Sequence, residues 1–183
     1  MTACSGCEEQ AVTGRRSSTQ GFGLPEKQTI TGVVGICTTT DDMELITADS
    51  SSVFVETFNR RIYGSCEPGD SVHVTYMDID GHLVSSAVVN LRQIASHWEA
   101  LPDSTGDYLS MDLLADNHVS TSVDGEPYDP YIQWNLFDGE LLLTAPSDST
   151  QPVTVDTFSI RSLSDDSLLL FNQERNIIYK KIK

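Results

Sequence analysis

Two cysteines near the start of the chain, Cys4 and Cys7, have the Cys-x-x-Cys spacing of redox and metal-binding motifs. A redox pair of this type needs a helix N-terminus after a strand to lower the pKa of its thiol. Here two glutamates follow the pair and would raise that pKa, and the polar stretch behind them contains nothing that could lower it. A zinc site needs two further ligands at suitable spacing, but the other cysteines, Cys37 and Cys66, are single.

The tripeptide Thr2-Ala3-Cys4 favours a different interpretation. Small residues before a cysteine, with a flexible polar tether behind it, resemble the mature start of bacterial lipoproteins. The residue three before the cysteine is usually Leu there and is Met1 here. The resemblance implies a lipid on Cys4, which would anchor the chain to the outer membrane at its periplasmic face or at the cell surface. A redox role for Cys4 and Cys7 requires an unlipidated Cys4 and stays open.

The acidic composition of the chain argues against some partners. Its net charge is −16, which repels phosphate backbones, so we expect no nucleic-acid partner. There is no apolar run long enough for a transmembrane helix. A length of 183 residues with 39% hydrophobic residues suits one domain or two small ones.

The elements that would position any site are strands. Residues 1–27 lack periodicity and are typical of a flexible tether. Residues 28–93 contain five short segments rich in Val, Ile and Thr, separated by turn sequences such as Asp80-Gly81. This pattern predicts a small OB-like or SH3-like β-barrel.

Residues 94–183 continue the strand pattern. With the segment around Trp98 they contain about eight strands, joined by turns that include Asp124-Gly125 and Asp138-Gly139. Strands connected up and down in this way close into a barrel. The fold class is therefore predicted to be all-β, with two small antiparallel barrels in tandem.

The second half of the chain also resembles a known family. Its features are a Trp-containing strand, an Asp-Gly turn before a Leu-rich strand, the pattern I-x-x-L-x-x-D-S-L-x-L, and a final Tyr-Lys-Lys. They are supplied here by Trp134, Asp138, Gly139, Ile160, Leu163, Asp166, Ser167, Leu168, Leu170, Tyr179, Lys180 and Lys181. This string is similar to a lipocalin-like family of small lipoproteins from gut Gram-negative bacteria. The resemblance implies an envelope location and an eight-stranded lipocalin-like barrel, with no particular ligand.

Four aromatic residues of the second barrel are candidates for a ligand mouth: Trp98, Trp134, Tyr128 and Tyr131. The alternative is that these rings pack in the core. An eight-stranded barrel is just wide enough for its own side chains or one small ligand. Because the predicted strands are short, a filled or nearly filled barrel is favoured.

The remaining thiols suggest either a bond or two buried groups. Cys37 ends the first predicted strand, and Cys66 precedes the strand DSVHVTY. If these strands pair antiparallel, Cys37 and Cys66 could form a disulfide in an oxidising compartment. Two separately buried thiols are the alternative.

Other motifs do not indicate chemistry. The stretch Asp78–His82 resembles the start of a calcium loop, but the twelfth position is Val89 rather than an acid, so a hairpin is favoured. The four histidines (His73, His82, His97 and His118) lack ligand spacing, so no metal or other cofactor is expected. No nucleophile elbow or phosphate loop is present, and we expect no catalytic residues and no enzyme activity.

Together these patterns predict a non-enzymatic envelope lipoprotein that binds a small apolar or amphipathic ligand in its C-terminal barrel. The alternative is a protein–protein interaction module, for envelope sensing or scaffolding, with a filled barrel. Its partner would be another envelope protein.

Overall fold

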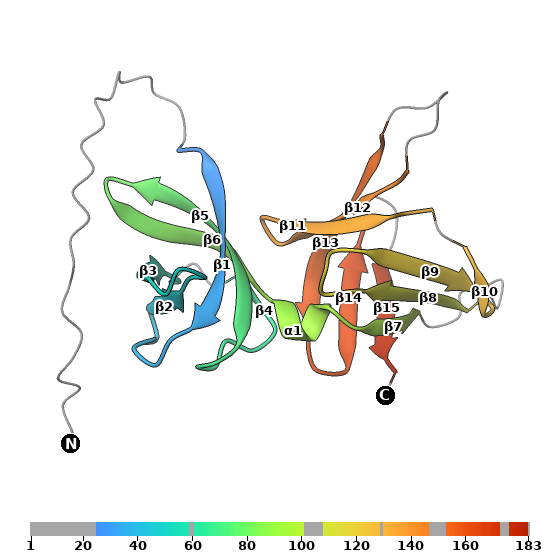
Figure 1. The fold of residues 1–183 in the computed structure, drawn as a ribbon, viewed down its shortest axis with the longest axis horizontal. Helices are drawn as coiled ribbons and strands as arrows, with labels where there is room; N and C mark the ends of the chain where they lie inside the picture. The colour runs from blue at the N-terminus through green and yellow to red at the C-terminus, as the bar shows by residue number, and fades with distance from the viewer. Residues whose placement is uncertain are drawn as a thin grey trace.

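The fold consists of two β-sheets in tandem, joined by one short helix (Figure 1). A computed structural model of the chain describes residues 25–58, 61–100, 108–128, 130–146, 153–172 and 176–182. Within these ranges the only helix is α1 (Leu91–Ile94), so the prediction of an all-β chain is confirmed. No helix in the same ranges is long and apolar enough to cross a membrane.

The first sheet forms a small barrel, called here the N-terminal barrel. Its strands are β1 (Lys27–Val34), β2 (Asp42–Ile46), β3 (Ser52–Glu56), β4 (Ile62–Tyr63), β5 (Ser71–Ile79) and β6 (His82–Asn90). Five of them follow the order β3-β2-β1-β5-β6, and a parallel pairing of Glu56 with Val84 closes the ring between β3 and β6. Alternating side chains such as Leu45, Val55 and Val74 fill its core. The result is OB-like, as predicted.

The second sheet, called the C-terminal sheet, is a curled meander. Its strands are β7 (His97–Ala100), β8 (Leu109–Leu113), β9 (Val119–Val123), β10 (Glu126–Pro127), β11 (Gln133–Phe137), β12 (Glu140–Thr144), β13 (Val155–Leu163), β14 (Ser167–Phe171) and β15 (Asn176–Lys181). Their order is β10-β9-β8-β7-β15-β14-β13-β12-β11. In the described residues, a single isolated bridge between His118 and Gln133 joins the β9 and β11 sides.

The predicted closed barrel of eight strands is therefore corrected to a curled sheet of nine. The additional strand is β10, which has only two residues. β10 pairs with the free edge of β9, where Glu126 lies opposite Val123. Among the described residues, β11 approaches this side only beside His118, because in the antiparallel register of that bridge Trp134 lies opposite Asn117, so β11 runs away from β9.

The three Asp-Gly pairs form the predicted hairpin turns. The φ angles are 54° and 90° at Asp80-Gly81, 52° and 82° at Asp124-Gly125, and 52° and 75° at Asp138-Gly139. Two successive positive φ angles define the type I′ turn, which matches the twist of paired strands. Asp and Gly suit these positions because they adopt positive φ angles with little conformational strain.

One end of the C-terminal sheet is plugged by its own side chains and by α1. Ile94 of α1 and Trp98 are fully buried, and the Trp98 indole N–H donates to the Ile94 carbonyl oxygen at 2.9 Å. Asn90 caps the helix, since its side-chain oxygen accepts from the Gln93 amide at 2.9 Å. The opposite end, where β8, β13 and β15 begin, carries no such plug in the described residues.

The turn at Asp138 docks the two sheets against each other. The Asp138 amide donates to Thr75 Oγ1 at 2.9 Å, and its carboxylate accepts from Ser86 Oγ at 2.6 Å. Arg61 Nη2 donates to the Asp138 carbonyl oxygen at 2.8 Å, and Lys27 forms an ion pair with its carboxylate. A loop of the C-terminal sheet is thus held by three strands of the N-terminal barrel and by Arg61.

A second contact lies beside α1. Gln93 Nε2 donates to Asp165 Oδ1 at 2.6 Å, while Gln93 Oε1 accepts from the Ser65 amide at 2.8 Å. Tyr63 of β4 packs against the hydrophobic core of the C-terminal sheet. Polar and apolar contacts therefore join the two halves.

Candidate functional site

The unplugged end of the C-terminal sheet contains a pocket of about 750 Å³, called here the open-end pocket. It lies where β8, β13 and β15 begin and where β12 and β14 end. Its apolar wall includes Leu109, Met111, Leu143, Phe158 and Ile177. Small-molecule sites occupy roughly 300–1,000 Å³. Among the described residues, the expectation of a filled barrel therefore holds at the α1 end of the sheet, whereas this end contains a pocket.

The polar part of the open-end pocket centres on Tyr131 and Asp156. The Tyr131 hydroxyl donates to Asp156 Oδ2 at 2.5 Å. Burial, and then the hydrogen bond and negative charge of Asp156, raise the pKa of Tyr131 well above its ordinary value. Tyr131 is therefore a stable hydrogen-bond donor at neutral pH. Asp156 is the only charged residue among the described residues of the lining.

The four predicted mouth aromatics lie in three different places. Tyr128 and Tyr131 line the open-end pocket. Trp98 is fully buried beneath α1 and does not line it. Trp134 is 4% exposed, its indole N–H donates to the Leu114 carbonyl oxygen at 2.9 Å, and it lines a different pocket. The two tryptophans thus have the core placement that the sequence left as the alternative.

Sequence reasoning missed Phe158 and Asp156. Both lie on β13 and line the open-end pocket. Asp156, Phe158 and Ile160 are every second residue of this strand, and Ile160 is 1% exposed in the core. Because alternate residues of a strand share a face, the spacing Asp156-x-Phe158-x-Ile160 carried a signal for an inward-facing polar group at a barrel rim.

The predicted disulfide is absent, because Cys37 and Cys66 are not joined. The Cys37 amide donates to Glu44 Oε2 at 2.9 Å, which holds the turn after β1. Cys66 packs against the core of the N-terminal barrel. Burial, reinforced by the nearby charges of Asp70 and Glu67, raises the pKa of the Cys66 thiol to about 12. The predicted lipid-attachment residue Cys4 lies outside the described residues.

The other motifs have structural roles. Asp78 Oδ1 accepts from the Gly81 amide at 2.8 Å within the β5–β6 hairpin, so the calcium-like stretch forms a turn. His82 lies 2.9 Å from Glu56, and His97 lies 2.6 Å from Asp112. In the part of the chain that the structure describes, no three metal-ligating side chains gather.

Comparison with known proteins identifies the second half of the chain. A family model described as lipocalin-like matches residues 91–182. A crystal structure of a lipocalin-like protein from Bacteroides thetaiotaomicron VPI-5482 is 26% identical, with the match covering 49% of this chain and 97% of that chain at a TM-score of 0.37. A search of curated proteins gives no match.

The family carries a general expectation about activity. Lipocalin-like proteins generally bind ligands rather than catalyse reactions. The family match spans half of the 183 residues and includes the string from Trp134 to Lys181 on which the resemblance was based. The chain therefore belongs to the lipocalin-like family.

Proposed function

We propose that this protein binds one small amphipathic molecule in the open-end pocket and catalyses no reaction on it. The observation that carries the proposal is the pocket of about 750 Å³ at the unplugged end of the C-terminal sheet. It has apolar walls and a few convergent polar groups, which is the usual composition of a small-molecule site. The lipocalin-like family supports the same reading.

The charge of the open-end pocket narrows the class of ligand. Asp156 places a carboxylate at the wall, and no described lining residue is cationic. The whole chain adds a net charge of −16, which also repels anions. The ligand that fits is neutral or cationic, with an apolar body that packs against Phe158 and Ile177.

The pocket favours this function over an interaction module. The alternative function, protein–protein interaction, was predicted together with a filled barrel. In a filled barrel only the outer faces would be available to a partner. A pocket of ligand size instead supports binding of a small molecule inside the C-terminal sheet. The pocket also leaves apolar side chains such as Leu109 and Phe158 partly exposed. Exposure of apolar surface to water is unfavourable unless a ligand covers it.

We also propose that the protein is a lipoprotein of the cell envelope, anchored through Cys4. The residues Thr2-Ala3-Cys4 and the polar stretch behind them support this. The test is the intact mass of protein expressed from its full native gene. A diacylglyceryl group on an N-terminal fragment that contains Cys4 is the expected result. An unmodified thiol at Cys4 would refute the anchor without affecting the pocket.

Ligand binding can be tested with a neutral fluorescent probe, N-phenyl-1-naphthylamine. We expect saturable binding to the full chain. Phe158→Ala should weaken it roughly tenfold, because burial of a Phe ring contributes about 1.5–3 kcal/mol.

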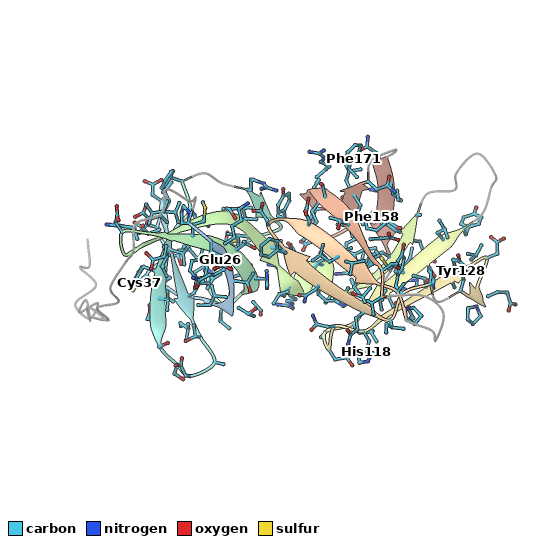
Figure 2. All side chains as sticks on the ribbon, turned by 90° about the horizontal axis from the view of Figure 1, so that it is seen from above. Glu26, Cys37, His118, Tyr128, Phe158 and Phe171 are labelled. Carbon is cyan, nitrogen blue, oxygen red and sulfur yellow. The ribbon has the colours of Figure 1, made fainter. Side chains whose placement is uncertain are left out.

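The matched control is Phe171→Ala on the neighbouring strand β14 (Figure 2). The buried residues Leu168 and Leu170 alternate with Phe171, and Arg161 lies 4.8 Å above its ring, so Phe171 faces away from the core. This control should leave the probe affinity unchanged. Equal losses in the two variants, or no saturable binding by the unaltered chain, would refute the proposal. Urea unfolding of both variants checks that they are folded.

A further inference from the structure

A second pocket, of about 580 Å³, lies between the two halves of the molecule and is called here the interdomain pocket. The N-terminal barrel contributes Ser71 and His73 of β5, and the helix α1 contributes Leu91 and Arg92. The C-terminal sheet contributes Trp134, Asn135 and Leu136 of β11. Figure 1 shows α1 at the junction of the two sheets, with β11 above it. Ligand sites occur preferentially at such domain interfaces.

The walls of the interdomain pocket are held together by the docking contacts. β11 runs from the pocket residue Leu136 directly into the turn at Asp138. That turn is fixed by hydrogen bonds to Thr75 and Ser86 of the N-terminal barrel. A pocket whose walls are already held in place avoids part of the entropic cost of ordering them when a ligand binds.

The charge in this pocket is opposite to that of the surrounding protein. Its described lining includes Arg92 and contains no Asp or Glu. The chain as a whole has 27 acidic residues and a net charge of −16. No ion pair joins Arg92 to another described residue, so its guanidinium can serve a ligand. An anion repelled elsewhere on the surface would be attracted here.

Hydrogen-bonding groups also line this pocket. The side-chain oxygen of Asn135 accepts from the Leu136 amide at 2.9 Å, which directs the oxygen to the backbone and leaves its NH₂ group for another acceptor. His73 also lines the pocket, with its Nδ1 3.3 Å from Thr31 Oγ1 and its imidazole beside the Leu136 backbone.

The histidine does not add a second positive charge. Burial lowers the pKa of His73, and the Leu136 backbone opposes that shift only in part. The imidazole is therefore neutral at pH 7. Arg92 is the one cation of the described lining, and the partly exposed Leu91 and Ala95 supply its apolar surface, whereas Trp134 and Leu136 are each only 4% exposed.

We propose that the interdomain pocket binds a small amphipathic carboxylate. Arg92 pairs with the carboxylate, the Asn135 NH₂ group donates a hydrogen bond, and the apolar body of the ligand packs on the partly exposed Leu91 and Ala95. This site is separate from the open-end pocket and selects the opposite charge. The two proposals can therefore fail independently.

The test compares two probes of the same shape, 2-naphthoate and its neutral analogue 2-naphthamide, by NMR titration of the ¹⁵N-labelled full chain. We expect 2-naphthoate to shift the amide resonances of Leu91, Ala95 and Leu136, and to bind roughly tenfold more tightly than 2-naphthamide, as for a hydrogen-bonded charge pair. Equal affinities, no binding of either probe at millimolar concentration, or shifts confined to the open-end pocket would each overturn the proposal.

Three variants test the role of Arg92 and the position of the site. Arg92→Gln should abolish the preference for the carboxylate, whereas Arg161→Gln removes an equal charge outside the pocket and should preserve it. Ala115→Trp, at an exposed position of the pocket lining, should block both probes. A preference for 2-naphthoate that survives Arg92→Gln, or binding of both probes that survives Ala115→Trp, would overturn the assignment.

Discussion

The Tyr131 hydroxyl donates a 2.5 Å hydrogen bond to the Asp156 carboxylate at the wall of the open-end pocket. The contact spans β12, because β12 pairs with β11 on one side and with β13 on the other. It connects the segment before β11 to the start of β13 and holds the only acidic group of the described lining in position. The charge preference of the pocket therefore depends on these two residues.

The first prediction concerns Asp156→Asn. This change removes the negative charge of the open-end pocket, so binding of a cationic dye such as thioflavin T should weaken about fivefold, as expected for a partly exposed charge pair. Binding of the neutral N-phenyl-1-naphthylamine should change little. Fluorescence titration of both probes measures the difference.

The matched control for this prediction is Asp124→Asn. Asp124 lies in the type I′ turn between β9 and β10, and Asn also tolerates its φ of 52°. The variant has the same net charge but an unaltered pocket lining. If Asp124→Asn weakens thioflavin T binding as much as Asp156→Asn does, the preference comes from overall charge and not from the pocket.

The second prediction compares two glycines with similar backbone angles. A Cβ atom at Gly139 would lie 2.8 Å from Tyr63 Cε2 and 2.9 Å from Arg61 Nη2, whereas one at Gly125 would meet no atom within 4 Å. Gly125→Ala should cost only the positive-φ penalty, about 1–2 kcal/mol. Gly139→Ala should cost about 1–3 kcal/mol more, because it also overpacks the contact between the two halves.

Urea unfolding of the two variants measures these costs. Equal losses of unfolding free energy would show that the turn at Asp138 is not packed against Tyr63 and Arg61 in solution. The two halves would then not dock in solution as they do in the structure. The residues that line the interdomain pocket would not be brought together.

The third prediction concerns acid. Burial raises the pKa of Asp138, but hydrogen bonds from Lys27 and Ser86 and the charges of Lys27 and Arg61 outweigh it, so the pKa is lowered overall. A lowered pKa in the folded state stabilises the protein above the unfolded pKa of about 3.9, and this contribution is lost as the pH falls through the folded value. Asp138→Asn should therefore reduce the melting temperature more at pH 7 than at pH 3.

Asp80→Asn is the control for this prediction, because it removes the same charge from a turn of the same type in the β5–β6 hairpin. Its melting temperature should follow that of the unaltered chain at both pH values. A loss in Asp138→Asn that is equally large at pH 3 would mean that the ionised carboxylate does not hold the two halves together.

The fourth prediction concerns the thiols, in a chain with Cys4→Ser and Cys7→Ser. A thiol whose pKa is raised to about 12 has little thiolate at pH 8, so Cys66 should react slowly with Ellman's reagent until the protein unfolds. Under denaturing conditions without reductant, both Cys37 and Cys66 should react. An intact mass lower by two hydrogens would instead show the disulfide that is absent from the structure.

Local patterns were sufficient to predict most of the strands. Alternation of apolar residues indicated β5 and β14, and the Asp-Gly pairs marked the hairpin turns because few other residues tolerate two positive φ angles. The two-residue strands β4 and β10 were missed, since a pair of residues has no periodicity. The incomplete closure of the C-terminal sheet could not be predicted either, because it depends on the register between β11 and the segment before β9.

The position of a residue along the barrel axis was the information that the sequence lacked. Trp98 and Tyr131 are both aromatic residues of the C-terminal sheet, yet Trp98 lies at the plugged end and Tyr131 at the open end. Strand alternation identifies the inner face but not the end of the barrel, which depends on the stagger between strands. The pairing of Tyr131 with Asp156, 25 positions away, likewise follows from tertiary structure.

NMR mapping of N-phenyl-1-naphthylamine on the ¹⁵N-labelled chain shows whether a ligand occupies the open-end pocket. We expect saturable one-to-one binding, with amide shifts at Leu109, Phe158 and Ile177 around the pocket. No binding would contradict it, and so would shifts that fall instead on exposed apolar residues such as Phe54 and Ile46 of the N-terminal barrel.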